Sequence, residues 1–236
     1  MIIDTTYDYR EDARSRNGAP RDPDKYSKKL KQSHQLLWSK ALPNGGSLSL
    51  DENLVNQTDI GNIPFASDSI IPTFSYWNKL HHIISQIHVE EIERFDAFSH
   101  TIAGTIIFPL AGGEKKTTFN QDRGTNRSIQ DRFDLTLECI RLYYLGESSP
   151  LYESCLKYKK FFDLFVNFRG YVEFFLLQDL VDEKSMSVKF FLPFEQFGIH
   201  TLPESKEEYY IYMKNSLSFI EKRNQRIAQW TNNENK

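Results

Sequence analysis

The chain has 236 residues, of which 29 are basic and 32 acidic, so its formal net charge is −3 and its pI is near 6.1. This balance gives no overall positive field to attract nucleic acid, and a nucleic-acid role would need a local basic patch. The length suits one hydrophobic core, which 18 Phe, 12 Tyr and 3 Trp make unusually aromatic. No window approaches the length of a transmembrane span, so we expect no membrane partner.

The N-terminal stretch and the two cysteines both favour a cytoplasmic protein. The first residues, MIIDTTYDYREDARSR, carry acids where a secretory signal peptide carries only basic residues, and they lack a continuous apolar segment. Cys139 and Cys155 fall in expected helices, and no second pair exists to make a zinc knuckle or a disulfide framework. We therefore expect free, buried thiols.

Turn signals dominate the start of the chain, and a helix follows. Residues 1–26 are polar and contain two prolines and one glycine, so we expect an N-terminal arm. A helix should begin at Pro23 with Asp22 as its N-cap. LPNGGSLSLD then predicts a turn and a short strand. The side of the helix that faces the core is expected to hold Leu30, His34, Leu37 and Trp38.

Helical periodicity resumes after Pro72, and a hairpin is expected further on. Apolar residues recur there at steps of three and four. The β-branched run 105–108 and the polar run 116–119 flank the sequence AGG, which predicts a β-hairpin whose first strand ends at Pro109. The apolar positions of the preceding helix are Phe74, Trp77, Leu80, Ile84 and Ile87.

The second half of the chain reads as mostly helical. A helix over 128–145 is apolar around most of its circumference, and Gly170 should end the next one. For 171–181 periodicity leaves helix and strand open, and we favour helix because the run is long, with SVKFFLPF after it as a strand. A long amphipathic helix closes the chain. The expected fold is α+β, a predominantly helical single domain over 27–230 with a small β-hairpin or sheet, and a disordered tail at 231–236.

Several phrases resemble a family of uncharacterised bacterial proteins. They are LLWSKALPNGG, SDSIIPTFSYW, TIAGTIIFP, NQDRGTNRSIQDRFDLTLECIRLYY and GYVEFFLLQDLV, which together cover nearly the whole chain. The resemblance implies a bacterial intracellular protein and carries no established activity.

A second resemblance is to proteins associated with restriction and phage defence. HTIAGT followed by FNQDRG is similar to their H-T-I-G-N and N-x-x-R-G stretches, and some of them have nuclease domains of the His-Asn-His type. Here Ala103 and Gly104 replace Gly and Asn. The upstream LHHIISQIH falls in an expected helix, so the histidine dyad of such nucleases has no counterpart at the expected place.

A wedge of charge interrupts the apolar surface of the helix over 128–145. Its carboxylates, Asp131, Asp134 and Glu138, are spaced to converge on a hard cation such as magnesium, with Asp68 as a further candidate ligand. The alternative is a solvated or salt-bridged face in which Arg141 neutralises Glu138, as charge runs on helices usually are. The cofactor is therefore open, with a divalent cation as a candidate.

The sequence NQDRG should form a loop that leads into the N-terminus of this helix, where free N–H groups favour anions. Forked hydrogen bonds from arginines there would hold a phosphate or a nucleic-acid backbone. In the alternative, Asn120 and Gly124 serve turn geometry, and the arginines pair with nearby aspartates. The candidate ligand-binding residues are Asn120, Arg123, Arg127, Arg132 and Arg141.

His100 is the candidate general base, because it precedes a strand and is expected to approach the NQDRG loop. Asp134 and Glu138 complete the catalytic candidates. The first expectation is a protein that binds a phosphate-bearing ligand, nucleotide or nucleic acid at the loop 120–132, with hydrolytic chemistry assisted by these groups. The alternative is a non-catalytic protein-interaction module, defence- or toxin-related. Enzymatic activity, oligomeric state and partners are left open.

Overall fold

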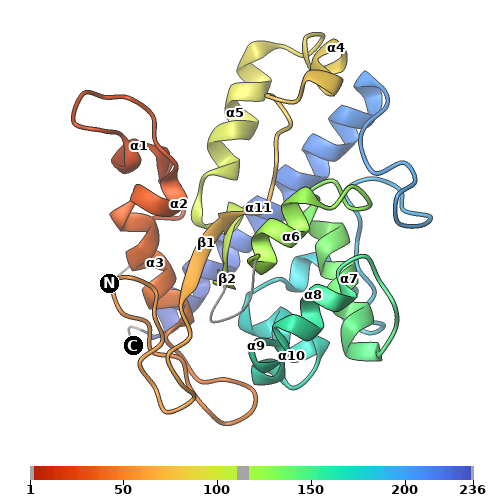
Figure 1. Ribbon diagram of the computed structural model, residues 1–236. Helices are drawn as coiled ribbons and strands as arrows, with labels where there is room; N and C mark the ends of the chain where they lie inside the picture. The colour runs from red at the N-terminus through yellow and green to blue at the C-terminus, as the bar shows by residue number, and fades with distance from the viewer. Residues whose placement is uncertain (1–2, 111–116, 235–236) are drawn as a thin grey trace.

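The computed structural model describes residues 3–110 and 117–234. Two strands lie at the centre of the molecule, with α1 to α3 on one side of them, α6 to α10 on the other, and the long helix α11 running behind (Figure 1). The α-helices are α1 Arg10–Ala13, α2 Pro23–Tyr26, α3 Lys28–Trp38, α4 His81–Ile84, α5 Val89–Ser99, α6 Phe119–Thr125, α7 Phe133–Leu145, α8 Tyr152–Lys157, α9 Lys159–Phe162, α10 Phe168–Phe174 and α11 Lys206–Glu234. The 3-10 helices are η1 Asn78–Leu80, η2 Ile102–Gly104, η3 Asp163–Phe165 and η4 Gln178–Leu180.

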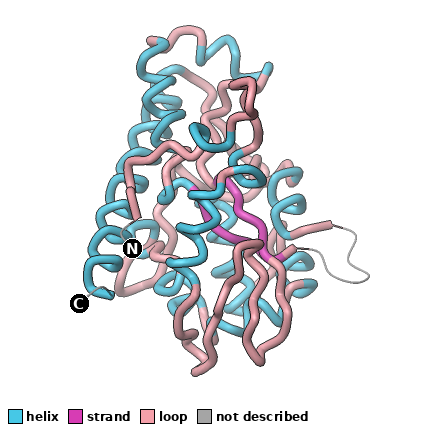
Figure 2. The backbone as a smooth tube through the Cα atoms, turned by 90° about the vertical axis from the view of Figure 1, so that its left-hand side faces the viewer, coloured by secondary structure: helices cyan, strands magenta, loops and turns pink. Residues whose placement is uncertain are grey.

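The sheet consists of β1 (Phe65–Ser69) and β2 (Thr105–Pro109), which pair antiparallel with Phe65 opposite Pro109. Every residue of β2 is buried, since helices surround the two strands (Figure 2). The predicted α+β class, mostly helical with a small sheet, is therefore confirmed. Within the described part of the chain, no helix has the length and apolar character needed to cross a membrane.

The predicted hairpin partner of β2 is wrong. β2 ends at Pro109 as expected but pairs with β1, and Phe119 begins α6 instead of ending a strand. A capping box fixes this helix start, because the Thr118 side chain accepts from the Gln121 N–H while the Gln121 side chain bonds the Thr118 N–H. The AGG sequence and Lys116 lie outside the described residues.

The expected helix from Pro23 is divided at Ser27. Asp22 caps α2 as predicted, accepting from the Asp24 N–H at 3.0 Å. Ser27 then adopts an extended conformation, and its hydroxyl accepts from the Leu30 N–H, which starts α3. The residues predicted to face the core from α3 are all buried: Leu30, His34, Leu37 and Trp38.

The helix expected after Pro72 is wrong for residues 72–77. Phe74 has a φ of 59°, in the left-handed region that a helix cannot accommodate. Two tyrosines of α11 hold this segment, since the hydroxyls of Tyr209 and Tyr212 donate to the carbonyls of Thr73 and Pro72, each at 2.7 Å. Those two carbonyls therefore bond to α11 and not within a local helix. The first helical turn after Pro72 is η1.

Three further expectations in the second half of the chain are corrected. α7 begins at Phe133, not at Ser128, because residues 126–132 form a turn. Gly170 lies inside α10, and the chain turns instead at Val166, where φ is 68°. The favoured helix over 171–181 is present as the end of α10 and as η4, whereas SVKFFLPF contributes only a bridge between Val181 and Val188.

The amphipathic helix predicted at the end of the chain is present as α11. The guanidinium of Arg223, fully buried, donates to the carbonyls of Ala103, Thr105 and Phe175, and so joins α11 to η2, β2 and the end of α10. The helix extends to Glu234, so residues 231–234 of the expected disordered tail are helical. The division of the chain into an arm, one domain and a tail stays a prediction.

Candidate functional site

A pocket of about 340 Å³ lies where the end of β1, the loop 70–77, the end of α5 and the turn before α7 meet. Four ionisable side chains line it, and each is partly exposed: 14% for Asp68, 19% for Asp96, 22% for His100 and 27% for Asp131. They come from three separate segments of the chain, namely β1, the end of α5 and the turn before α7, so only the folded protein brings them together.

Asp68 is held from behind by two residues of α6. The Arg123 guanidinium, 1% exposed, lies 2.5 Å from one Asp68 oxygen, and the Asn120 amide donates to the other at 2.7 Å. Burial raises the pKa of Asp68 to about 7, and the charges of Asp24 and Asp131 add to this rise, while Arg123 and Asn120 oppose it. Asp68 is therefore a carboxyl group poised to titrate near neutral pH.

Asp131 shares the same arginine. Arg123 Nη1 lies 3.0 Å from Asp131 Oδ1, and Nη2 donates to the Asp131 carbonyl at 2.9 Å. The first contact is an ion pair and not a hydrogen bond, so Oδ1 has a charge partner but no hydrogen-bond donor among the described residues. Asp131 also has a φ of 62°, a strained conformation for a residue with a side chain. Two carboxylates thus compete for one guanidinium.

Asp96 and His100 stand four residues apart at the end of α5. The N-terminal arm holds Asp96 through Arg10, which also binds Asp8. His100 Nδ1 lies 2.8 Å from the Asp96 carbonyl, and because a carbonyl only accepts, Nδ1 carries a proton and Nε2 is the nitrogen that can exchange one. The Tyr9 N–H donates to the His100 carbonyl at 3.1 Å, which fixes the end of the helix.

Gly104 explains why His100 sits where it does. A Cβ at this position would lie 2.0 Å from the Ser99 carbonyl oxygen, so only glycine permits the tight passage from α5 into β2. The Gly104 carbonyl also accepts from the Ile70 N–H at 2.9 Å, at the start of the pocket loop. The same turn therefore positions both His100 and the loop opposite it.

A buried hydrogen-bond chain lies behind β1. The Trp38 indole donates to His34 Nδ1, so His34 Nε2 carries the proton and donates to the Ser67 hydroxyl, which donates to Asp24 at 2.7 Å. Burial lowers the pKa of His34 to about 3, so this ring stays neutral. Burial also raises the pKa of Asp24. The chain ties α2 and α3 to the strand that carries Asp68.

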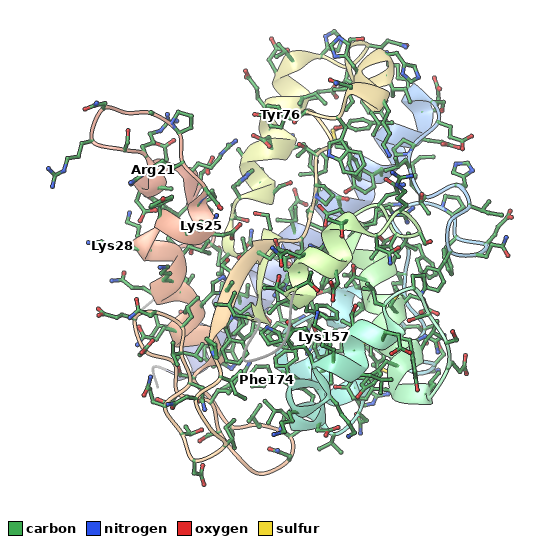
Figure 3. The ribbon with its side chains drawn as sticks, in the orientation of Figure 1. Arg21, Lys25, Lys28, Tyr76, Lys157 and Phe174 are labelled. Carbon is green, nitrogen blue, oxygen red and sulfur yellow. The ribbon has the colours of Figure 1, made fainter. Side chains whose placement is uncertain are left out.

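Aromatic residues of the loop 70–77 also line the pocket. The centre of the Phe74 ring lies 4.9 Å from the centre of the Trp77 ring and 5.2 Å from that of Tyr212. Tyr76 is 91% exposed and projects from the loop that passes alongside α5 (Figure 3). Lys79 Nζ lies 4.6 Å from the centre of the Trp77 ring, at the outer edge. The pocket lining thus includes both carboxylates and aromatic residues.

The remaining candidate residues lie elsewhere. Arg132 and Asp134 form a buried pair at the start of α7, and Asp134 also accepts from the Phe191 N–H at 2.8 Å. Glu138 and Arg141 pair through two hydrogen bonds of 2.8 Å. Arg127 is exposed. The structure therefore brings His100, Asn120 and Arg123 close to one pocket but places Asp134, Glu138 and the other arginines outside it.

The three carboxylates proposed as magnesium ligands do not converge. Asp131 is not on a helix with the other two, and each of the three faces its own arginine. Across residues 3–110 and 117–234, no group of three or more His, Cys, Asp or Glu side chains is arranged to hold a metal ion. Both cysteines are free and buried, as predicted.

Asp96 is the lining residue that sequence reasoning missed. Its spacing of four residues from His100 was visible in the sequence, since DAFSH places both side chains on one face of a helix. The approach of Arg10 and Tyr9 from the N-terminal arm gave no comparable signal, because those contacts span about ninety residues and depend on tertiary packing.

These residues form a mostly helical α+β fold with a carboxylate-rich pocket. The chain belongs to a family of unknown function, DUF6994, whose family model matches residues 3–227. No curated protein and no solved structure is significantly similar to it. The expected membership of a family of uncharacterised proteins is confirmed, whereas a bacterial source, a cytoplasmic location and a link to phage defence stay predictions.

Proposed function

We propose that this pocket binds a small organic cation that carries an amine or guanidinium group. The observation that supports this most is charge: three carboxylates, Asp68, Asp96 and Asp131, line the pocket, while the two arginines that pair with them, Arg10 and Arg123, are not among its lining residues. The excess of negative charge within reach of a ligand favours a positive partner.

The uneven sharing of Arg123 supports the same conclusion. One guanidinium faces the carboxylates of both Asp68 and Asp131, at 2.5 Å and 3.0 Å. Two carboxylates therefore share one positive charge, and an incoming cation would compensate the second carboxylate. An ammonium or guanidinium ligand supplies this charge together with N–H donors.

The aromatic lining residues suit the same ligand class. Cations are attracted to the faces of Trp, Tyr and Phe rings, and Phe74, Tyr76 and Trp77 are among the residues that line the pocket. A volume of about 340 Å³ lies within the range of small-molecule sites. His100 also lines the pocket, and its Nε2 is the atom placed to take a proton if the bound ligand reacts.

A phosphate-bearing ligand, the expectation from the NQDRG sequence, is less well supported by this geometry. Arg123 and Arg132 are each 1% exposed and already face carboxylates. The loop 120–132 contributes Asp131 to the pocket, and that residue would repel a phosphate. Arg127 is the member of the arginine set that faces solvent. The alternative of a protein-interaction module stays a prediction.

The test is isothermal titration calorimetry with ligands of similar size and different charge. Butylguanidine and n-butylamine are the cations, butyramide is the neutral control, butyrate is the anion, and AMP represents phosphate-bearing ligands. We expect saturable binding of the cations and at least tenfold weaker binding of the others. Asp131→Asn should weaken cation binding about tenfold, whereas Asp59→Asn, on an exposed loop, should leave it unchanged.

Each contrary result has a distinct meaning. Binding of AMP in preference to both cations would overturn the proposed ligand class and restore the phosphate hypothesis. Binding of cations that is equally strong in Asp131→Asn and wild type would place the site elsewhere on the surface.

A further inference from the structure

A second cavity, of about 320 Å³, lies between the N-terminal arm, the end of α5 and the middle of α11. It shares no lining residue with the first pocket. Thr6 and Asp8 of the arm, Ala97 and Phe98 of α5, and Asn224 and Gln225 of α11 are among its walls. These segments are distant in sequence, so the cavity exists only because the arm packs against the two helices.

Asn224 carries an unsatisfied acceptor at this cavity. Its Nδ2 group donates to the Thr101 hydroxyl at 3.2 Å, and its Oδ1 atom is buried without a hydrogen-bond partner. The Thr101 hydroxyl itself donates to the Phe98 carbonyl at 2.8 Å, so it has no proton left for Asn224. In this amide orientation Nδ2 bonds the Thr101 hydroxyl and Oδ1 is the atom left without a donor.

The rest of the wall is largely apolar near this acceptor. Phe98 and Ala97 line the cavity from adjacent positions of α5, and Thr5 and Thr6 line it from the arm. Apolar walls with few polar groups that fix orientation are typical of small-molecule sites. An aromatic ring of the ligand would pack on Phe98, and a single N–H or O–H group would satisfy Asn224 Oδ1.

We infer that this cavity is a second binding site, which takes a small aromatic molecule that carries one hydrogen-bond donor. The two sites meet at Arg10, whose guanidinium binds Asp96 of the first pocket and Asp8 of the second cavity. The inference does not depend on the ligand proposed for the first pocket, since neither the cavity nor Asn224 contributes to it.

The experiment uses indole and 1-methylindole, which differ in the N–H donor. Heteronuclear NMR titration of the full chain should show saturable indole binding, with the amide shifts of Phe98 and Asn224 moving. Indole should bind about two- to tenfold more tightly than 1-methylindole, the range that one hydrogen bond supplies. Asn224→Leu should abolish this preference, because it removes the acceptor at nearly constant size.

A filled cavity provides the second arm of the test. Ala97→Leu should weaken both ligands at least tenfold, whereas Ala228→Leu, also on a helix but outside the cavity, should not. If Ala97→Leu does not fold, as judged by circular dichroism, Thr6→Leu fills the cavity from the arm. Asp131→Asn should leave indole binding unchanged, which separates this site from the first pocket.

The inference is overturned by any of three results: no saturable binding of indole, equal affinity of wild type for the two indoles, or full binding by a folded variant with a filled cavity.

Discussion

Arg123 Nη1 lies 2.5 Å from Asp68 Oδ2, so a nearly inaccessible guanidinium on α6 is paired with a carboxyl group on β1. The pair joins the helix that carries NQDRG to the strand pairing with β2. Arg123 was predicted to hold a ligand phosphate, but the structure turns it towards the interior, where it supports the pocket from behind.

Removal of Arg123 should therefore affect stability strongly. Arg123→Ala leaves the buried Asp68 without its cation, and loss of one partner of a buried pair costs about 3–5 kcal/mol. Arg127→Ala, on the exposed part of the same loop, should change stability by less than about 0.5 kcal/mol. Urea unfolding followed by circular dichroism measures both. Similar small effects of the two substitutions would show that Arg123 is not a structural member of the core.

The second buried pair should behave in the same way. Arg132 and Asp134 are both almost fully buried, so Arg132→Ala is expected to cost about 3–5 kcal/mol. Arg141→Ala removes a partly exposed partner of Glu138, and this should cost about 1 kcal/mol or less. Thermal unfolding of the two variants tests the difference. A larger loss in Arg141→Ala would reverse the assignment of these arginines to core and surface.

Stability should decrease with pH where Asp68 holds its proton. The pKa of Asp68 is about 7 in the folded protein because of burial, against an ordinary value of 3.8. Between these values the folded state keeps a proton that the unfolded chain has released, so the Asp68 contribution to stability is complete below about pH 4 and is lost as pH rises through 7. The free energy of unfolding of wild type minus that of Asp68→Asn should decrease over this window. An increase would mean that the charge of Arg123 outweighs burial and holds the pKa of Asp68 below its ordinary value.

Two glycines should respond to alanine in opposite directions. At Gly104 a Cβ would lie 2.0 Å from the Ser99 carbonyl oxygen, so Gly104→Ala should cost about 1–3 kcal/mol. Gly124 lies within α6, where the nearest atom to a Cβ is 3.7 Å away, and Gly124→Ala should stabilise by about 0.5–1 kcal/mol. Differential scanning calorimetry distinguishes them. Destabilisation by Gly124→Ala would indicate a turn role, as the sequence suggested.

The sequence predicted those elements whose spacing and capping residues lie within a single segment. The buried face of α3, the Asp22 cap and the long amphipathic α11 follow from spacing and capping residues within a few turns. The sheet partner of β2 was missed because β1 is forty residues upstream and FASDS reads as polar. Strand pairing across forty residues produces no pattern within either segment of the sequence.

The candidate site was predictable only in part. His100, Asn120 and Arg123 were identified from residue type and from their place near a strand and a helix start, and they do lie at or behind one pocket. The direction in which each of these side chains points was not predictable from the sequence. Whether an arginine faces a ligand or a carboxylate depends on Asp68 and on the turn at Asp131, whose φ of 62° interrupts an otherwise convincing helical pattern.

The proposed binding of a cation requires that the carboxylates of the pocket are ionised. The most direct test is the affinity for butylguanidine, measured by calorimetry from pH 5.5 to 8.5 in wild type, Asp68→Asn and His100→Gln. We predict that affinity rises through about pH 7 in wild type and in His100→Gln, and that this rise is absent in Asp68→Asn. An affinity that does not change with pH in wild type, or that falls as Asp68 ionises, would contradict the account.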